Sequence, residues 1–84
     1  MDYRSKIIVK LNETFSPRIL KVIDESENHR GHSGFIEGQQ THFQVQIESK
    51  IFKGMSRIAR EREIHRALGD EIIGNIHAIS IKFL

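Results

Sequence analysis

Thr41-His42-Phe43-Gln44-Val45-Gln46-Ile47-Glu48-Ser49 carries the cleanest strand pattern in the chain. Polar and apolar side chains alternate along it, which is typical of a β-strand with one buried face. The apolar positions are Phe43, Val45 and Ile47. The pattern therefore predicts a half-buried strand over 41–49, with His42 opening it on the polar face.

The segment before this strand is unusually long and rich in histidine. Residues 25–42 hold three of the five histidines, His29, His32 and His42. A structureless connection of more than about 12–15 residues in a compact domain is usually functional or disordered. It follows a short β-branched run, Arg18–Asp24, which we expect to be a largely buried strand.

Helical patterns lie on either side of these two strands. Residues 2–14 show a single apolar stripe that ends at Ser16-Pro17. After a turn at 50–54, Ser56 is a candidate N-cap for a helix to about Leu68, which Gly69 ends or bends before a last short turn through Ile73. Its predicted core stripe is Ile58, Glu61, His65, Leu68 and Ile72, with Ile64 beside it.

The last strand is expected over Ile76–Phe83, with His77 on its apolar side. The element order is then αββααβ, which predicts an α+β two-layer sandwich with the helices on one face of a three-stranded sheet. A helical crossover between the second and third strands favours a parallel pair, so the sheet should be mixed. At 84 residues, the chain is expected to form a single domain, 1–84.

Composition excludes several classes of chemistry. The chain has no cysteine, so it alone offers no disulfide, no thiolate nucleophile and no thiolate metal site. The sequence lacks an apolar run of membrane-spanning length and a signal-peptide pattern, from which we expect a cytoplasmic protein without membrane contact. It also lacks a phosphate-binding glycine loop and a zinc-protease motif, and a non-enzymatic role is expected.

The histidines are the best candidates for chemistry. Imidazole is the commonest protein metal ligand near neutral pH, and His29, His32 and His77 can meet if the long connection and the last strand share one edge of the sheet. Three interpretations stay open: solvated or buried structural histidines, a self-contained metal site, or a site completed by a partner. His42 and His65 are expected to be structural.

Positive charge is concentrated in one segment. Residues 50–66 carry a local charge of +4, whereas the whole chain has a formal net charge of +2. Lysine and arginine on such a segment can contact phosphates, although a charged helix is more often simply solvated.

Several short motifs, taken in order, resemble the BolA family. They are Val22-Ile23-Asp24-Glu25-Ser26 followed by His29, Thr41-His42-Phe43-Gln44-Val45, Phe52-x-Gly54, Arg60-x-Arg62, Ala67-Leu68, and Ile76-His77-Ala78-Ile79-Ser80-Ile81. The resemblance covers nearly the whole chain. It implies a fold similar to the type II KH domain, which agrees with the element order predicted above.

The resemblance also implies a function. Proteins of this family pair with monothiol glutaredoxins and share a bridged 2Fe-2S cluster, to which the glutaredoxin cysteine and glutathione give thiolates and the BolA protein gives imidazole. On this basis the chain is a monomer alone and a heterodimer with its partner, and holds no cofactor by itself. The ligands map onto His77 and, in the long connection, His29, with His32 as the alternative.

A second role is implied by the same resemblance. Family members are also described as transcriptional regulators that bind DNA through the helical face. That face falls on Lys53, Arg57, Arg60 and Arg62 in this chain.

Overall fold

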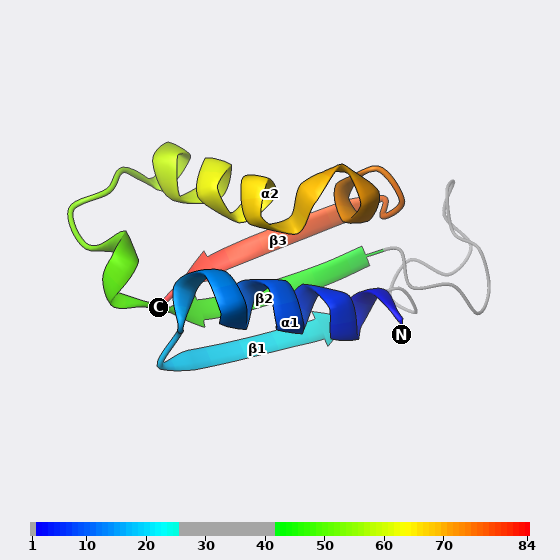
Figure 1. The fold of residues 1–84 in the computed structure, drawn as a ribbon, viewed down its shortest axis with the longest axis horizontal. Helices are drawn as coiled ribbons and strands as arrows, with labels where there is room; N and C mark the ends of the chain where they lie inside the picture. The colour runs from blue at the N-terminus through cyan, green and yellow to red at the C-terminus, as the bar shows by residue number, and fades with distance from the viewer. Residues whose placement is uncertain (1, 26–41) are drawn as a thin grey trace.

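A computed structural model describes residues 2–25 and 42–84 of the chain (Figure 1). The order of elements agrees with the predicted αββααβ pattern. The elements are α1 (Tyr3–Phe15), β1 (Ile19–Asp24), β2 (His42–Glu48), the short 3-10 helix η2 (Lys50–Phe52), α2 (Arg57–Ile73) and β3 (Ala78–Phe83).

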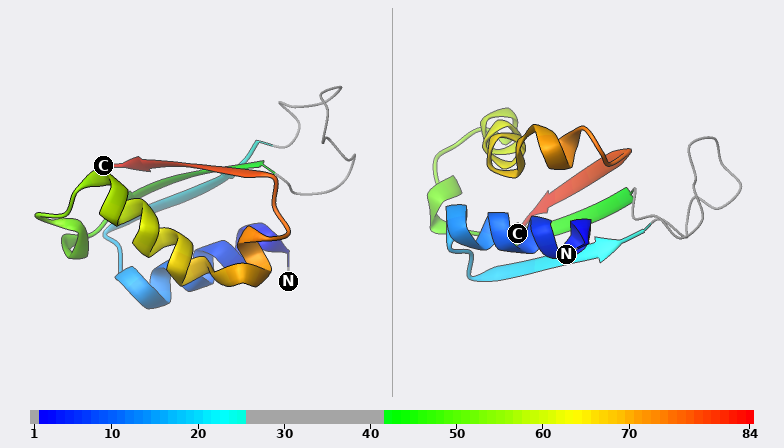
Figure 2. Two further views of the ribbon diagram at one scale, coloured as in Figure 1. Left: turned by 90° about the horizontal axis from the view of Figure 1, so that it is seen from above. Right: turned by 45° about the vertical axis from the view of Figure 1, so that its right-hand side comes forward.

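The sheet is mixed, as predicted. Its strands lie in the order β1-β2-β3, so β2 is central. β1 pairs with β2 antiparallel, with Val22 opposite Val45, and β2 pairs with β3 parallel, with Val45 opposite Ile81. Figure 2 shows, in the left view, that both helices cover the same face of this sheet.

Side-chain caps explain where the two helices begin. The Asp2 carboxylate accepts a hydrogen bond from the Ser5 N–H at 2.8 Å, and the Ser56 hydroxyl accepts one from the Ala59 N–H at 3.1 Å. The prediction that Gly69 bends the second helix is confirmed. Gly69 has φ 80° and ψ 169°, outside the helical region, in a conformation that only glycine adopts at low cost.

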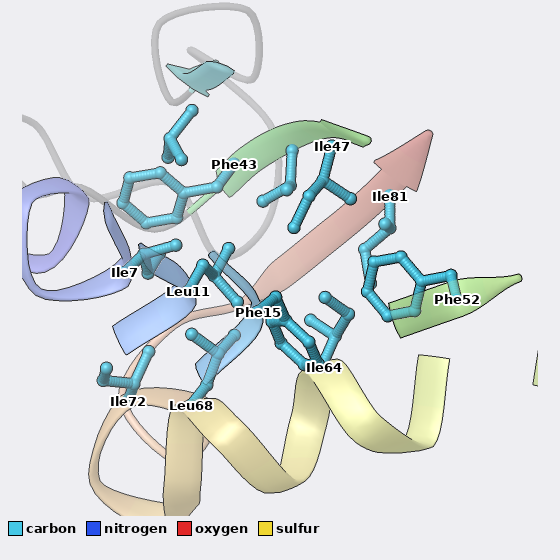
Figure 3. Packing of buried hydrophobic residues seen from close by; sticks show 12 residues of the cluster. Ile7, Leu11, Phe15, Phe43, Ile47, Phe52, Ile64, Leu68, Ile72 and Ile81 are labelled. Carbon is cyan, nitrogen blue, oxygen red and sulfur yellow. The ribbon is translucent and has the colours of Figure 1, made fainter. Parts of the chain in front are cut away.

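One hydrophobic core lies between the sheet and the two helices (Figure 3). The helices contribute one turn-spaced row each, and the sheet contributes its helix-facing side chains. The buried apolar residues are Ile7, Leu11, Phe15, Val22, Phe43, Val45, Ile47, Phe52, Ile64, Leu68, Ile72 and Ile81. Aromatic rings close the end of the core near the C-terminus, where Phe52 lies 4.9 Å from Phe15 and 5.2 Å from Phe83 between ring centroids.

Two packing predictions are wrong. β1 is not largely buried, because it is an edge strand with one covered face, and Val22 is its one fully buried residue. In α2, Ile58 is 63% exposed and His65 is also exposed, while Ile64 joins Leu68 and Ile72 in the core. Leu68 and Ile72 of the predicted stripe do lie in the core. At 3.6 residues per turn, Ile58 projects roughly 120° away from Ile64, so only the N-terminal part of the predicted stripe faces away from the sheet.

Within the part of the chain that the structure describes, no helix combines the length and the apolar character needed to cross a bilayer. The cytoplasmic location stays a prediction.

Candidate functional site

One end of the sheet brings two of the five histidines together. β1 ends there, and both β2 and β3 begin there (Figure 1). The Glu25 N–H donates to the His42 carbonyl at 2.8 Å, and His42 is the parallel register partner of Ala78. The backbone of His42 is therefore held between the two outer strands at the first position of the central one.

His42 is buried, which the sequence did not reveal. Its exposed fraction is 7%, and among the described residues it is the one polar or charged residue in the buried class. The alternation along β2 correctly separated His42 from the helix-facing residues. It does not predict how buried a residue on the opposite face of the sheet is. Every fully buried side-chain nitrogen or oxygen in the described part of the chain has a hydrogen-bond partner.

His77 is exposed and lies in the bend that leads into β3. The prediction that it belongs to the apolar side of the last strand is wrong, because β3 begins at Ala78 and strand parity does not extend back to residue 77. Its ring lies 4.7 Å from the ring of His42 between centroids, with the planes tilted by 41°. A tilted arrangement at this separation is a favourable packing geometry for flat rings.

The side chains at this end of the sheet can be compared with the ligand set that a metal needs. His77 presents an accessible imidazole, whereas residues 2–25 and 42–84 contain no group of three histidine, cysteine, aspartate or glutamate side chains placed to hold a metal ion. The chain also has no cysteine. An accessible imidazole is a donor that a two-iron cluster accepts, and the thiolates of such a cluster would have to come from another molecule.

The predicted ligands His29 and His32 lie outside the described residues. His65 is on the exposed side of α2, away from the core. His42 is the residue that the sequence analysis missed as a neighbour of His77. A sequence signal could have indicated this neighbour. The helical crossover predicts that β2 and β3 are parallel, and parallel strands that pair in register start at the same end of a sheet, which places His42 close to His77.

The four predicted nucleic-acid residues do not form one surface. Lys53 and Arg60 line a shallow groove beside Phe83 and Leu84 at the C-terminal end of β3. Arg62 lies instead on the outer side of α2, in a hollow shared with Ile58, Glu61, His65 and Arg66.

Two of these arginines make contacts within the molecule. The Arg57 guanidinium lies 3.4 Å from the Glu61 carboxylate and donates to the Ile81 carbonyl at 3.4 Å. Arg60 donates to the Met55 carbonyl at 3.0 Å, and its guanidinium lies 5.6 Å from the centre of the Phe83 ring.

Surface ion pairs shift the pKa of groups away from the histidine pair. Hydrogen bonding from Arg18 lowers the pKa of the Glu48 carboxyl across the β1–β2 pair. Hydrogen bonding from Lys6 likewise lowers the pKa of Glu71, and joins α1 to α2 at 2.9 Å.

The fold defines a small α+β protein with a mixed three-stranded sheet and an exposed histidine just before its parallel edge strand. A family model described as BolA-like protein matches residues 11–84. The chain therefore belongs to the BolA-like family.

Individual relatives agree with this assignment. An uncharacterized protein of Sinorhizobium sp. is 41% identical over 83 residues, which are 98% of this chain and 89% of that protein. The DNA-binding transcriptional regulator BolA of Vibrio cholerae is 39% identical over 72 residues, 86% of this chain and 64% of that protein. The chain spans about half, 53%, of BolA-like protein 1 of Mus musculus.

A solved structure has the same fold. The BolA domain of SufE1 from Arabidopsis thaliana superposes with a TM-score of 0.81 at 36% identity, covering 95% of this chain and 87% of that one. The predicted fold class is confirmed by this likeness.

Proposed function

We propose that this chain is a non-enzymatic partner of a monothiol glutaredoxin and supplies a histidine ligand to a 2Fe-2S cluster bridging the two proteins. Its role would be in iron–sulfur assembly or iron regulation. The observation that carries the proposal is the exposed His77 imidazole at the open end of the sheet, in a family member that has no cysteine of its own.

The ligand chemistry supports a shared site. Two-iron clusters accept imidazole in place of thiolate, and the replacement raises the reduction potential. When bound, such a cluster supplies one-electron redox chemistry. The part played by this chain is to hold one imidazole at a fixed place and leave the thiolate positions to the glutaredoxin and glutathione.

A second ligand is proposed in the connection between β1 and β2. His29 is the first choice and His32 the alternative, as the family resemblance implies. The described ends of the connection support a ligand from it, because the Glu25 N–H donates to the His42 carbonyl and the His42 ring contacts the His77 ring.

The test is anaerobic reconstitution with the glutaredoxin, glutathione, iron and sulfide. The native chain, its His77→Ala variant and a His65→Ala control are compared by visible absorption and circular dichroism. His65 is a matched control, since it is also an exposed histidine but lies on α2. We expect the native and His65→Ala spectra to coincide and the His77→Ala spectrum to differ; identical spectra for all three would exclude His77 as a ligand.

DNA binding is the second candidate function. Two observations favour it: the local charge of +4 over residues 50–66, and the name of the Vibrio cholerae relative, a DNA-binding transcriptional regulator. Lys53, Arg57, Arg60 and Arg62 would contact phosphates. A gel-shift assay that finds no salt-sensitive complex at micromolar protein would remove this candidate.

A further inference from the structure

The buried histidine of the sheet has no role in the function proposed so far. His42 is deeply buried at the head of the central strand, and its ring is in contact with the ring of His77. Polar side chains are rarely buried this fully unless they are paired or have a function. The contact with the proposed ligand indicates what that function is.

We infer that His42 is a positioning residue. Its ring packs against the His77 imidazole and restricts the rotamers of His77, so that His77 is oriented before a cluster binds. This inference rests on the proposed function, because orientation of His77 matters only if His77 is a ligand.

The first support is the rigidity of His42. Its strand is flanked on both sides, its carbonyl accepts the Glu25 N–H, and its register partner Ala78 starts the parallel ladder. A buried ring on a doubly paired backbone has little room to change its rotamer.

The second support is the freedom that His77 would otherwise have. It is exposed, precedes the first ladder residue of β3, and follows the exit turn at Gly74-Asn75. An exposed side chain on such a bend samples several rotamers unless a neighbour restricts it. The tilted ring contact with His42 supplies that restriction.

The third support is the exposure difference within the pair. Because His42 is 7% exposed and His77 is exposed, a partner approaching this end of the sheet meets the ring of His77. Neighbours that orient a ligating histidine raise metal affinity about 10- to 100-fold in other sites. We expect an effect at the lower end of this range, since one ring contact is involved.

Two matched substitutions separate positioning from ligation. His42→Phe keeps a flat ring against His77 and removes both ring nitrogens; His42→Leu keeps an apolar side chain and removes the ring. Both variants remove the side-chain hydrogen bonding of His42, so a difference between them reports the ring contact alone. Far-ultraviolet circular dichroism establishes that each variant is folded.

The first readout uses the isolated chain without a cluster. NMR coupling constants give the χ1 populations of His77. We expect one dominant rotamer in the native chain and in His42→Phe, and several in His42→Leu. Equal χ1 averaging in the native chain and in His42→Leu would overturn the inference.

The second readout is the rate at which the reconstituted complex loses its cluster to a chelator. We expect His42→Phe to match the native chain and His42→Leu to lose the cluster about tenfold faster. A cluster spectrum that is altered in both variants as it is in His77→Ala would make His42 a ligand and overturn the positioning role. If the native chain forms no cluster, the proposed function fails, while the χ1 measurement still decides whether His42 orients His77.

Discussion

The rings of His42 and His77 pack against each other at the end of the sheet where the central strand and the parallel edge strand both begin, 4.7 Å apart between centroids. One ring is buried and the other is exposed. The buried ring of His42 thus packs against the accessible imidazole of His77. This relationship links the packing of the sheet to the proposed ligand role of His77.

The inward face of α2 can be checked by paired substitutions in one helix. Ile64→Ala removes a fully buried side chain and should lower the free energy of unfolding by about 2–5 kcal/mol. Ile58→Ala truncates an exposed side chain in the same helix and should change it by less than about 0.5 kcal/mol. Urea unfolding measures both. Equal losses would mean that the helix is rotated relative to the structure.

The bend in α2 depends on glycine. Gly69→Ala should destabilise the protein by about 1–3 kcal/mol, because φ 80° with ψ 169° is a glycine-only region. The Cβ would meet nothing within 4 Å, so the cost is backbone strain and not a clash. The control Ala67→Gly, in the regular part of the helix, should cost about 1 kcal/mol through helix propensity. A Gly69→Ala variant as stable in urea as the native chain would contradict the bend.

The ion pair between the two helices should make stability depend on pH. The pKa of Glu71 is lowered from its ordinary value of 4.5 by the hydrogen bond from Lys6. A carboxyl whose pKa is lower in the folded state stabilises the fold above its unfolded pKa, and this contribution is lost as the pH falls below 4.5 and through the folded pKa.

Comparison with Glu71→Gln isolates that contribution. Urea unfolding measures the free energy of unfolding of the native chain and of the variant at about pH 7 and about pH 3. The difference between the two proteins should be larger at about pH 7 than at about pH 3. Salt should reduce the difference at neutral pH, because both groups are at the surface. The same difference at both pH values would rule out the pair as its cause.

Much of this fold could be predicted from sequence patterns. Alternation located β2, and the Ser56 cap and Gly69 located the start and the bend of α2. The helix phase could not be fixed in the same way, since Ile58 and Ile64 both belong to plausible apolar stripes and only packing against the sheet selects one of them. Motif resemblance supplied His77, which neither spacing nor parity could distinguish from a structural histidine.

The pairing of His42 with His77 required the three-dimensional structure. It depends on the parallel register of β2 and β3, which places two chain segments far apart in sequence at the same end of the sheet. It also depends on the burial of His42, and the alternation of polar and apolar residues along β2 does not predict that burial. The predicted ligands His29 and His32 remain outside the described residues.

The second candidate function predicts a specific salt dependence. If the basic side chains at the start of α2 bind duplex DNA, replacing Arg57 or Arg60 with Gln should weaken binding. The slope of log affinity against log salt should fall by about one for each phosphate that is no longer neutralised. Arg18→Gln is the control, because Arg18 is an exposed arginine that precedes β1 and lies outside the segment 50–66. Fluorescence anisotropy at several salt concentrations measures the slopes. Equal slopes for all variants would exclude phosphate binding through the start of α2.

The ligand role of His77 is tested most directly by pulsed electron paramagnetic resonance on the reduced cluster. The chain is labelled with nitrogen-15 and reconstituted with an unlabelled glutaredoxin and glutathione. We predict a strongly coupled nitrogen signal that changes from the nitrogen-14 to the nitrogen-15 pattern when this chain alone is labelled. The same signal should be altered in His77→Ala and unchanged in His65→Ala. A cluster whose nitrogen couplings are unaffected by labelling this chain would contradict the account.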